Sequence, residues 1–203
     1  ELSVEAMLLH RFLASASMSI GFHGMPETDV AGESVPPPVM EEMLLLDTDK
    51  DIAGASMPEP FASLAVRSGT ARKLCTTSSL WKDHPGSVFV LSDSVADNRP
   101  EETNALITGF IDAAARLHNG PDPDTLDHAG QFLGIETDFV RQILADSGIC
   151  FDPRLLAPDI PMLNMIRDYM AHTMNTLDGQ TEIETSADPS LYLNRLKETI
   201  REN

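Results

Sequence analysis

Basic residues are scarce in this chain of 203 residues. Lysine and arginine together number 14, against 32 aspartates and glutamates, and the formal net charge is −18. Nucleic acids and anionic membranes are bound through basic surfaces, so neither is expected as a partner. A small anion stays compatible with this charge, because the N-terminus of a helix can attract an anion locally.

Cysteines and long apolar runs are also scarce. The two cysteines, Cys75 and Cys150, lie far apart in the sequence and lack the spacing of metal ligands. We therefore predict two buried thiols rather than a disulfide. The sequence shows no signal peptide and no run of 18 apolar residues, a pattern that by itself favours a cytoplasmic protein.

Common catalytic motifs are missing as well. The sequence contains no G-x-S-x-G, no H-E-x-x-H, no phosphate-binding loop and no paired cysteine and histidine. His118, His128 and His172 belong to three separate helical patterns. The acidic run at residues 47–51 has Ile52 where a calcium loop needs glycine, so we interpret it as a polar turn. We expect no enzyme activity, no cofactor and no metal site.

The most informative stretch that is present runs from Val35 to Pro60. A strand ends at Val35, and Pro36–Pro38 cannot continue it, because proline has no N–H to donate. A short helix follows. Asp51–Met57 has the apolar character of a buried parallel strand, and a second helix opens at Pro58. This β-α-β-α succession predicts an α/β fold, with a strand end beside a helix start, where α/β sheets bind ligands.

Periodicity extends this pattern along the chain. Residues 21–28 form a predicted loop, and residues 93–203 are predicted to be rich in helices. Further strands are expected at Asp29–Val35, Arg72–Thr76 and Ser87–Ser92. Helices are expected at Val4–Met18, Thr77–Trp81, Pro100–Leu117, Asp124–Leu133, Thr137–Leu144, Pro161–Met174 and from about residue 188 to Ile200.

Several short motifs occur in a characteristic order. They are Val35-Pro36-Pro37-Pro38 with Met40, Ile52 with Gly54, Glu59-Pro60-Phe61 with Ala65, and Trp81 with Asp83-His84-Pro85. Their order and spacing resemble the substrate-binding proteins of ABC importers for nitrate, bicarbonate, sulfonates and thiamine precursors. The resemblance covers nearly the whole chain and implies a periplasmic-binding-protein-like fold of type II, with a three-layer αβα lobe and a helix-rich return segment.

The resemblance also implies a domain organisation. Residues 1–92 would form the second lobe, and residues 93–203 would return toward the first lobe, whose N-terminal part would be absent. The chain would then be partial, and its parent an extracytoplasmic protein, periplasmic, lipid-anchored or secreted, with a signal sequence outside this chain. A missing lobe would expose an apolar face, so a homodimer is expected.

The resemblance implies a ligand cleft between the two lobes. The residues expected to contribute to it are Ser3, Glu5, Ser56, Met57, Glu59 and Ser87. Two of them have an alternative structural role, because Ser3 is a natural N-cap and Glu59 complements a helix start. We interpret Trp81, the only tryptophan, as a packing anchor under the cleft rather than a platform for ligand.

Two positions of this cleft concern the ligand. Nitrate and bicarbonate receptors of the family have a histidine near the start of the first helix and a lysine two positions after the His-Pro pair. Here these positions hold Glu5 and Ser87, and a serine supplies only a neutral donor. The replacements argue against a small inorganic anion. They leave sulfonates, amine-bearing or aromatic heterocycles, or a neutral ligand.

The function implied by the resemblance is capture of a small solute for an ABC importer by lobe closure, with the transmembrane permease subunits as partners. Two alternatives stay open: a ligand-sensing domain of a signalling protein, and an enzyme similar to the pyrimidine-precursor synthases that share this fold. The histidine- and cysteine-bearing segments of those synthases are not recognisable here.

Overall fold

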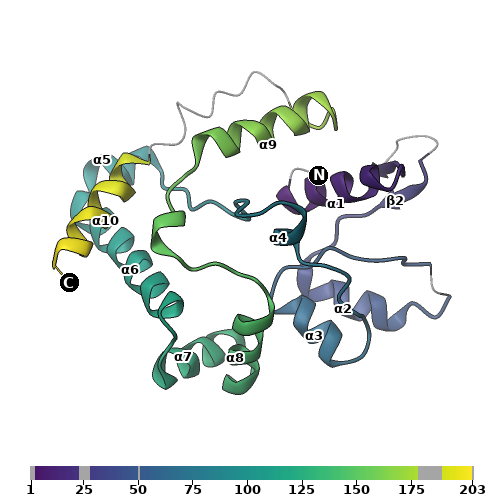
Figure 1. Cartoon of the computed structure of the whole chain (residues 1–203), viewed down its shortest axis with the longest axis horizontal. Coiled ribbons are helices and arrows are strands. Elements are labelled where there is room, and N and C mark those ends of the chain that lie inside the picture. The colour runs from purple at the N-terminus through teal and green to yellow at the C-terminus, as the bar shows by residue number, and fades with distance from the viewer. Residues whose placement is uncertain (1–2, 23–27, 50, 178–188, 203) are drawn as a thin grey trace. The chain divides into compact units, whose positions relative to one another are not determined.

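The computed structural model describes residues 3–22, 28–49, 51–177 and 189–202 (Figure 1). Most elements are helices, and two short strands, β1 (Ile20–Phe22) and β2 (Val30–Gly32), pair in parallel with Ile20 opposite Val30. The helices are α1 (Val4–Ser15), α2 (Pro37–Leu46), α3 (Phe61–Arg67), α4 (Thr77–Leu80), α5 (Asp93–Asn98), α6 (Pro100–His118), α7 (Pro123–Leu133), α8 (Thr137–Asp146), η1 (Pro153–Leu155), α9 (Ile160–His172) and α10 (Ser190–Glu202).

The sheet is smaller than the sequence predicts. The strand expected at Asp29–Val35 is present as β2, whereas Asp51–Met57, Arg72–Thr76 and Ser87–Ser92 form no strand in the described residues. A strand needs a neighbouring backbone to share its hydrogen bonds, and an apolar run by itself does not supply one. Side chains in two of these segments face solvent, with Leu74 77% and Val90 76% exposed. The predictions of these three strands were wrong for the chain as described.

β1 occupies residues for which no strand was predicted. The loop expected at residues 21–28 begins inside β1, and residues 23–27, including His23, lie outside the described part of the chain. At Gly32, a Cβ atom would come within 2.6 Å of the Phe22 ring, so a larger residue here would force that ring to move.

Helix boundaries follow local chemistry closely. The hydroxyl of Ser3 accepts a hydrogen bond from the Ala6 N–H at 3.0 Å and caps α1. Asp122 does the same for α7 through the Thr125 N–H at 2.8 Å. At the other end of α7, Gly134 is left-handed with φ 69°, which suits glycine. The polar turn at residues 47–51 also has a structural basis, because the Asp47 carboxylate accepts from the Asp51 and Ile52 N–H groups, each at 3.0 Å.

The described chain divides into two compact units. Unit 1 comprises the described residues within Glu1–His84, Arg141–Gly148 and Asp168–Gly179. Its most buried large side chains are Met7 and Leu8 of α1, with exposures of 0% and 1%. α1 contacts α4, and α2 contacts α3. The buried side of α1 therefore fixes this helix against the rest of unit 1.

Unit 2 comprises the described residues within Pro85–Val140, Ile149–Arg167 and Gln180–Asn203. α6 is its central helix and contacts α5, η1 and α10. Ile111 and Ala114 of α6 are buried, and Leu196 of α10 is buried with them in this unit. The Arg195 side chain of α10 donates to the Thr108 hydroxyl of α6 at 2.7 Å. Unit 2 is thus a helical assembly around α6.

The predicted buried thiols were wrong. Cys75 and Cys150 are both free and exposed, because each lies in a connecting segment whose neighbouring side chains face solvent. Among the described helices, none has the length and apolar character that crossing a membrane requires. Within the same residues, no three histidine, cysteine, aspartate or glutamate side chains are arranged to hold a metal ion.

Candidate functional site

The corner before α3 carries three of the six predicted site residues. Ser56, Met57 and Glu59 are each partly buried. An oxygen of the Glu59 carboxylate accepts a hydrogen bond from the Ser63 N–H in the first turn of α3 at 3.1 Å. Glu59 therefore satisfies an otherwise unpaired helical N–H, which is the structural role that its position at a helix start predicts.

The start of α1 carries two more of the predicted site residues, Ser3 and Glu5. Ser3 is engaged as the N-cap, and Glu5 is the acidic residue of the first turn, partly buried. Both positions and the Ser56–Glu59 corner belong to unit 1. Among the described residues, no hydrogen bond or ion pair joins the start of α1 to that corner. Ser87 is exposed and belongs to unit 2.

A cluster that the sequence analysis did not identify lies in unit 1. We define the Arg11 cluster as His10, Arg11, Trp81, His84 and Tyr169. The guanidinium carbon of Arg11 lies 5.2 Å from the centre of the Trp81 ring and 5.7 Å from that of the Tyr169 ring. Both distances are within the range of a cation–π interaction. The contact between α1 and α4 holds the Arg11 and Trp81 segments together.

Polar contacts complete the Arg11 cluster. Nδ1 of His10 lies 2.8 Å from the Tyr169 hydroxyl, and the two rings meet edge to face. Burial raises the pKa of Tyr169, and the positive charge of Arg11 opposes that rise. The His84 ring centre is 6.4 Å from that of Trp81. In the described part of the chain, Nδ1 of His84 is buried without a hydrogen-bond partner.

One signal in the sequence could have identified this cluster. Arg11 follows Met7 by four positions, so the sequence places a charged residue on the same side of α1 as an apolar one. A cation at such a position calls for an aromatic or acidic partner. Its partners Trp81 and Tyr169 are distant in sequence, and periodicity contains no information about pairs of that kind.

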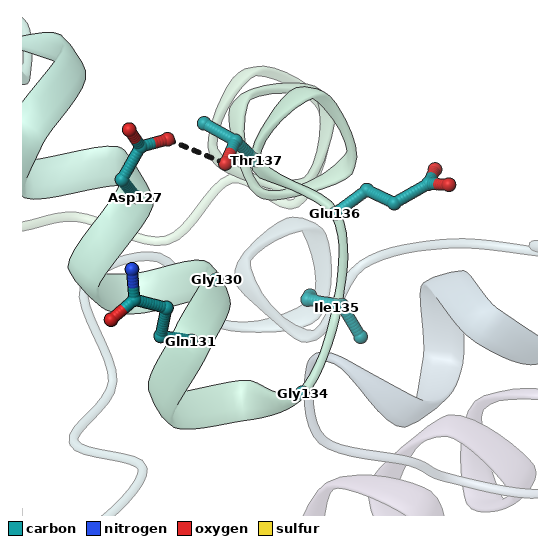
Figure 2. A pocket seen from close by; sticks show the side chains of 7 residues that line it. All are labelled: Asp127, Gly130, Gln131, Gly134, Ile135, Glu136 and Thr137. Carbon is teal, nitrogen blue, oxygen red and sulfur yellow. Dashed lines mark hydrogen bonds between the residues drawn. The ribbon is translucent and has the colours of Figure 1, made fainter.

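A separate pocket lies at the turn between α7 and α8 in unit 2 (Figure 2). It is open, has a volume of about 420 Å³, and is lined by Asp127, Gly130, Gln131, Gly134, Ile135, Glu136 and Thr137. The Thr137 hydroxyl donates to Asp127 at 2.6 Å across it. A Cβ atom at Gly130 would come within 2.8 Å of the Ile135 carbonyl, so glycine permits the tight turn. None of the six predicted site residues lines this pocket.

Comparison with known protein families identifies the group to which this chain belongs. The profile of the NMT1-like family matches residues 1–134 of the 203. The chain belongs to the NMT1-like family. This is a family of substrate-binding proteins of ABC transporters, typically periplasmic and typically without enzyme activity. The resemblance inferred from the motifs between Val35 and Pro85 is therefore confirmed.

Two curated relatives match part of the chain. It is 28% identical over 88 residues to the nitrate/nitrite binding protein NrtA of Nostoc sp., covering 43% of this chain and 19% of the relative. It is 26% identical over 144 residues to the nitrate import ATP-binding protein NrtC of Synechocystis sp., covering 68% of this chain and 20% of the relative. The chain thus spans about a fifth of the length of each. No solved structure matches it significantly.

The family implies a periplasmic-binding-protein fold of type II. The described residues agree with this in their parallel strand pairing and in their many helices, and they contain a smaller sheet than the sequence predicts. The family and the motif-based prediction therefore agree on the fold class. The described structure differs from that prediction in the extent of the sheet.

Proposed function

We propose that this NMT1-like chain is a solute-binding component of an ABC importer, for a small solute of the sulfonate, nitrate or thiamine-precursor class. The observation that carries the proposal is the family match over residues 1–134. The similarity to a nitrate/nitrite binding protein supports it. The proposed partners are the transmembrane permease subunits, and the proposed location is extracytoplasmic.

The proposed mechanism is closure of two lobes about a hinge. Residues 1–92 would form the second lobe, as a three-layer αβα arrangement in the intact protein, and residues 93–203 would return toward the first. The proposed ligand contacts come from the start of α1, the corner before α3 and the segment after the His-Pro pair. They are Ser3, Glu5, Ser56, Met57, Glu59 and Ser87. Helix N-termini and polar groups of the loops would then hold the solute.

Two of these residues bear on the solute. Glu5 places a negative charge at the start of α1, and Ser87 supplies a hydroxyl. Neither adds a positive charge for an inorganic anion, although the relative NrtA is named for nitrate and nitrite. A sulfonate or a thiamine-precursor pyrimidine is therefore favoured over nitrate or bicarbonate.

A thermal-shift screen of the full-length protein tests this proposal. The panel contains nitrate, bicarbonate, taurine, longer alkanesulfonates and thiamine-precursor pyrimidines. A ligand at about 100 times its dissociation constant adds about 2.7 kcal/mol to stability, which moves the melting temperature visibly. A shift with a sulfonate or pyrimidine supports the proposal. A shift with nitrate or bicarbonate shows that the interpretation of Glu5 and Ser87 is wrong, and no shift with any compound counts against solute capture.

A second candidate function is a ligand-sensing domain within a larger protein. The match with the nitrate import ATP-binding protein NrtC, which covers 68% of this chain but 20% of that protein, supports the part of this candidate that places such a domain within a larger protein. A kinase or cyclase domain on the same polypeptide would favour sensing, and neighbouring permease and ATPase genes would favour transport. No observation favours the third alternative, an enzyme similar to the pyrimidine-precursor synthases. Turnover of a pyrimidine precursor by the purified protein would support it.

A homodimer is a separate proposal. In unit 2 the extended segment before α5 exposes Val88, Phe89 and Val90, and Phe89 lies 5.0 Å from the ring of Phe110, which is also exposed. Exposed apolar groups that lie together favour association. Light scattering on the purified protein checks this proposal, and a monodisperse monomer would count against it.

A further inference from the structure

The Arg11 cluster has an unusual composition for so acidic a chain. Acidic residues outnumber basic ones by 32 to 14, so most cations have carboxylates available. In unit 2, Arg154 pairs with Asp152 and Arg195 pairs with Glu198. Arg11 is exposed and, among the residues that the structure describes, has no carboxylate within ion-pair distance. The rings of Trp81 and Tyr169 lie next to its guanidinium instead.

Aromatic contacts leave the hydrogen-bonding capacity of an arginine unused. A guanidinium has five N–H donors in its plane, and an interaction with a ring face satisfies none of them. The rings of Trp81 and Tyr169, 5.2 and 5.7 Å from Cζ, restrict the orientation of the group. The hydroxyl of Tyr169 is itself held by Nδ1 of His10 at 2.8 Å. Within the described residues, Arg11 is therefore an oriented cation whose in-plane donors meet no acceptor.

His84 gives a second, independent observation at the same tryptophan. Its Nδ1 is buried without a hydrogen-bond partner in the described residues, and buried polar nitrogens are rarely left in this state. The ring of His84 lies beside that of Trp81, at 6.4 Å between centres and tilted by 37°. Arg11 and His84 thus place two unsatisfied nitrogen-bearing groups against one indole.

We propose that the Arg11 cluster binds the carboxylate of a small aromatic acid. The planar guanidinium fork matches the two oxygens of a carboxylate, and such a bidentate pair is among the stronger hydrogen-bonded contacts. The rims of Trp81 and Tyr169 provide apolar surface for the ring that carries the carboxylate. None of the six predicted cleft residues belongs to this cluster, so it is proposed as a site of its own, although Trp81 is predicted to lie under the cleft.

Calorimetric titration of the full chain with sodium benzoate tests the proposal. Trp81 fluorescence gives a local signal, because it is the only tryptophan of the 203 residues. We expect saturable benzoate binding that changes this fluorescence. Benzamide has the same shape without the charge and is expected not to bind. The test fails for the proposal if wild-type protein shows no saturable benzoate signal, or if benzamide or nitrate binds equally well.

Substitutions then assign the effect to Arg11. Loss of a charged hydrogen-bonding partner is expected to weaken benzoate binding by about tenfold or more in Arg11→Ala, and by less in Arg11→Lys, which keeps the charge but loses the fork. Arg72→Ala is the matched control, since Arg72 is another exposed arginine of unit 1. Equal affinity of wild type and Arg11→Ala overturns the proposal. If Arg11→Ala does not fold, Arg11→Lys and the benzamide comparison decide.

Discussion

Arg11 and Arg154 show two different uses of the same side chain in the two units. In unit 2, the backbone N–H and Nε of Arg154 each donate to Asp152 at 2.9 Å, and Asp152 is only 8% exposed. The pair holds the turn at η1. In unit 1, Arg11 lies over two aromatic rings and, within the described chain, meets no acid.

The difference distinguishes a structural arginine from one that can bind. The backbone N–H, Nε and Nη2 of Arg154 all donate to the carboxylate of Asp152, so the cation is neutralised by an acid of the fold. Arg11 keeps its in-plane donors, and its rings hold it without neutralising it. Substitution of the first should therefore change stability, and substitution of the second should change binding.

The largest expected effect comes from the support of α1 itself. Leu8 is 1% exposed and lies one turn before Arg11. Leu8→Ala leaves a cavity in the core of unit 1 and should lower the free energy of unfolding by about 2–5 kcal/mol. Chemical denaturation followed by circular dichroism measures this loss. Benzoate binding should weaken as well, because α1 positions the guanidinium.

Leu74 supplies the control for that experiment. It belongs to the same unit and is 77% exposed, so Leu74→Ala should change the free energy of unfolding by no more than about 0.5 kcal/mol. Similar losses in the two variants would mean that Leu8 is not the core residue its burial indicates.

The next effect concerns Asp152 and depends on pH. Hydrogen bonds from the Arg154 side chain and backbone hold the pKa of Asp152 well below its usual range, and the charge of Arg154 adds to this. A carboxyl with a lowered folded pKa stabilises the fold above its unfolded pKa of about 3.9. That stability is lost as the pH falls from there through the folded pKa. Asp152→Asn should therefore lower the melting temperature near neutral pH, and the gap from wild type should narrow in acid.

A second aspartate tests whether the lower melting temperature of Asp152→Asn comes from the position of Asp152 or only from the loss of a negative charge. Asp112 is exposed on α6 in the same unit, and Asp112→Asn removes the same formal charge. Its melting temperature should stay close to that of wild type at every pH. A gap for Asp152→Asn that is constant from neutral to acidic pH would contradict the ion-pair explanation.

Local chemistry in the sequence predicted the helices well. The cap at Ser3, the prolines that open α2 and α6, and Gly134 after α7 each act through neighbours within a few residues. Strands depend on distant partners. Ser87–Ser92 has the composition of a buried strand, yet Val88 and Phe89 are 58% and 64% exposed, and no described segment pairs with them. Composition indicates that a segment is able to form a strand. Whether it does so depends on a neighbouring strand, which comes from another part of the fold.

The candidate sites follow the same rule. The family resemblance placed Ser3 and Glu59 in the cleft, helix-start chemistry offered capping as their alternative role, and both make the hydrogen bonds of that role. The Arg11 cluster joins residues up to 159 positions apart, from His10 to Tyr169, so no local pattern could reveal it. The sequence predicted Trp81 to be a packing anchor, and its contact with Arg11 gives that anchor a charged partner.

The smallest expected effects come from removing one tyrosine hydroxyl in each unit, by Tyr192→Phe in unit 2 and Tyr169→Phe in unit 1. The Tyr192 hydroxyl donates to the Pro153 carbonyl at 2.7 Å and joins α10 to η1. Tyr192→Phe should cost about 0.5–1.5 kcal/mol of unfolding free energy. Burial raises the pKa of Tyr192 to about 12, and the charge of Asp152 adds to this. A raised folded pKa stabilises below the unfolded value of about 10, so the cost should shrink as the pH rises from there toward the folded pKa.

Tyr169→Phe is the counterpart in unit 1. It removes the hydroxyl that Nδ1 of His10 contacts at 2.8 Å but keeps the ring near Arg11. Benzoate binding should weaken a few-fold, because the ring is then less firmly oriented. Tyr192→Phe lies in the other unit and should leave benzoate affinity unchanged. Equal weakening in both variants would show that the hydroxyls act through overall stability, and the distinction between a structural and a binding arginine would then lose its support.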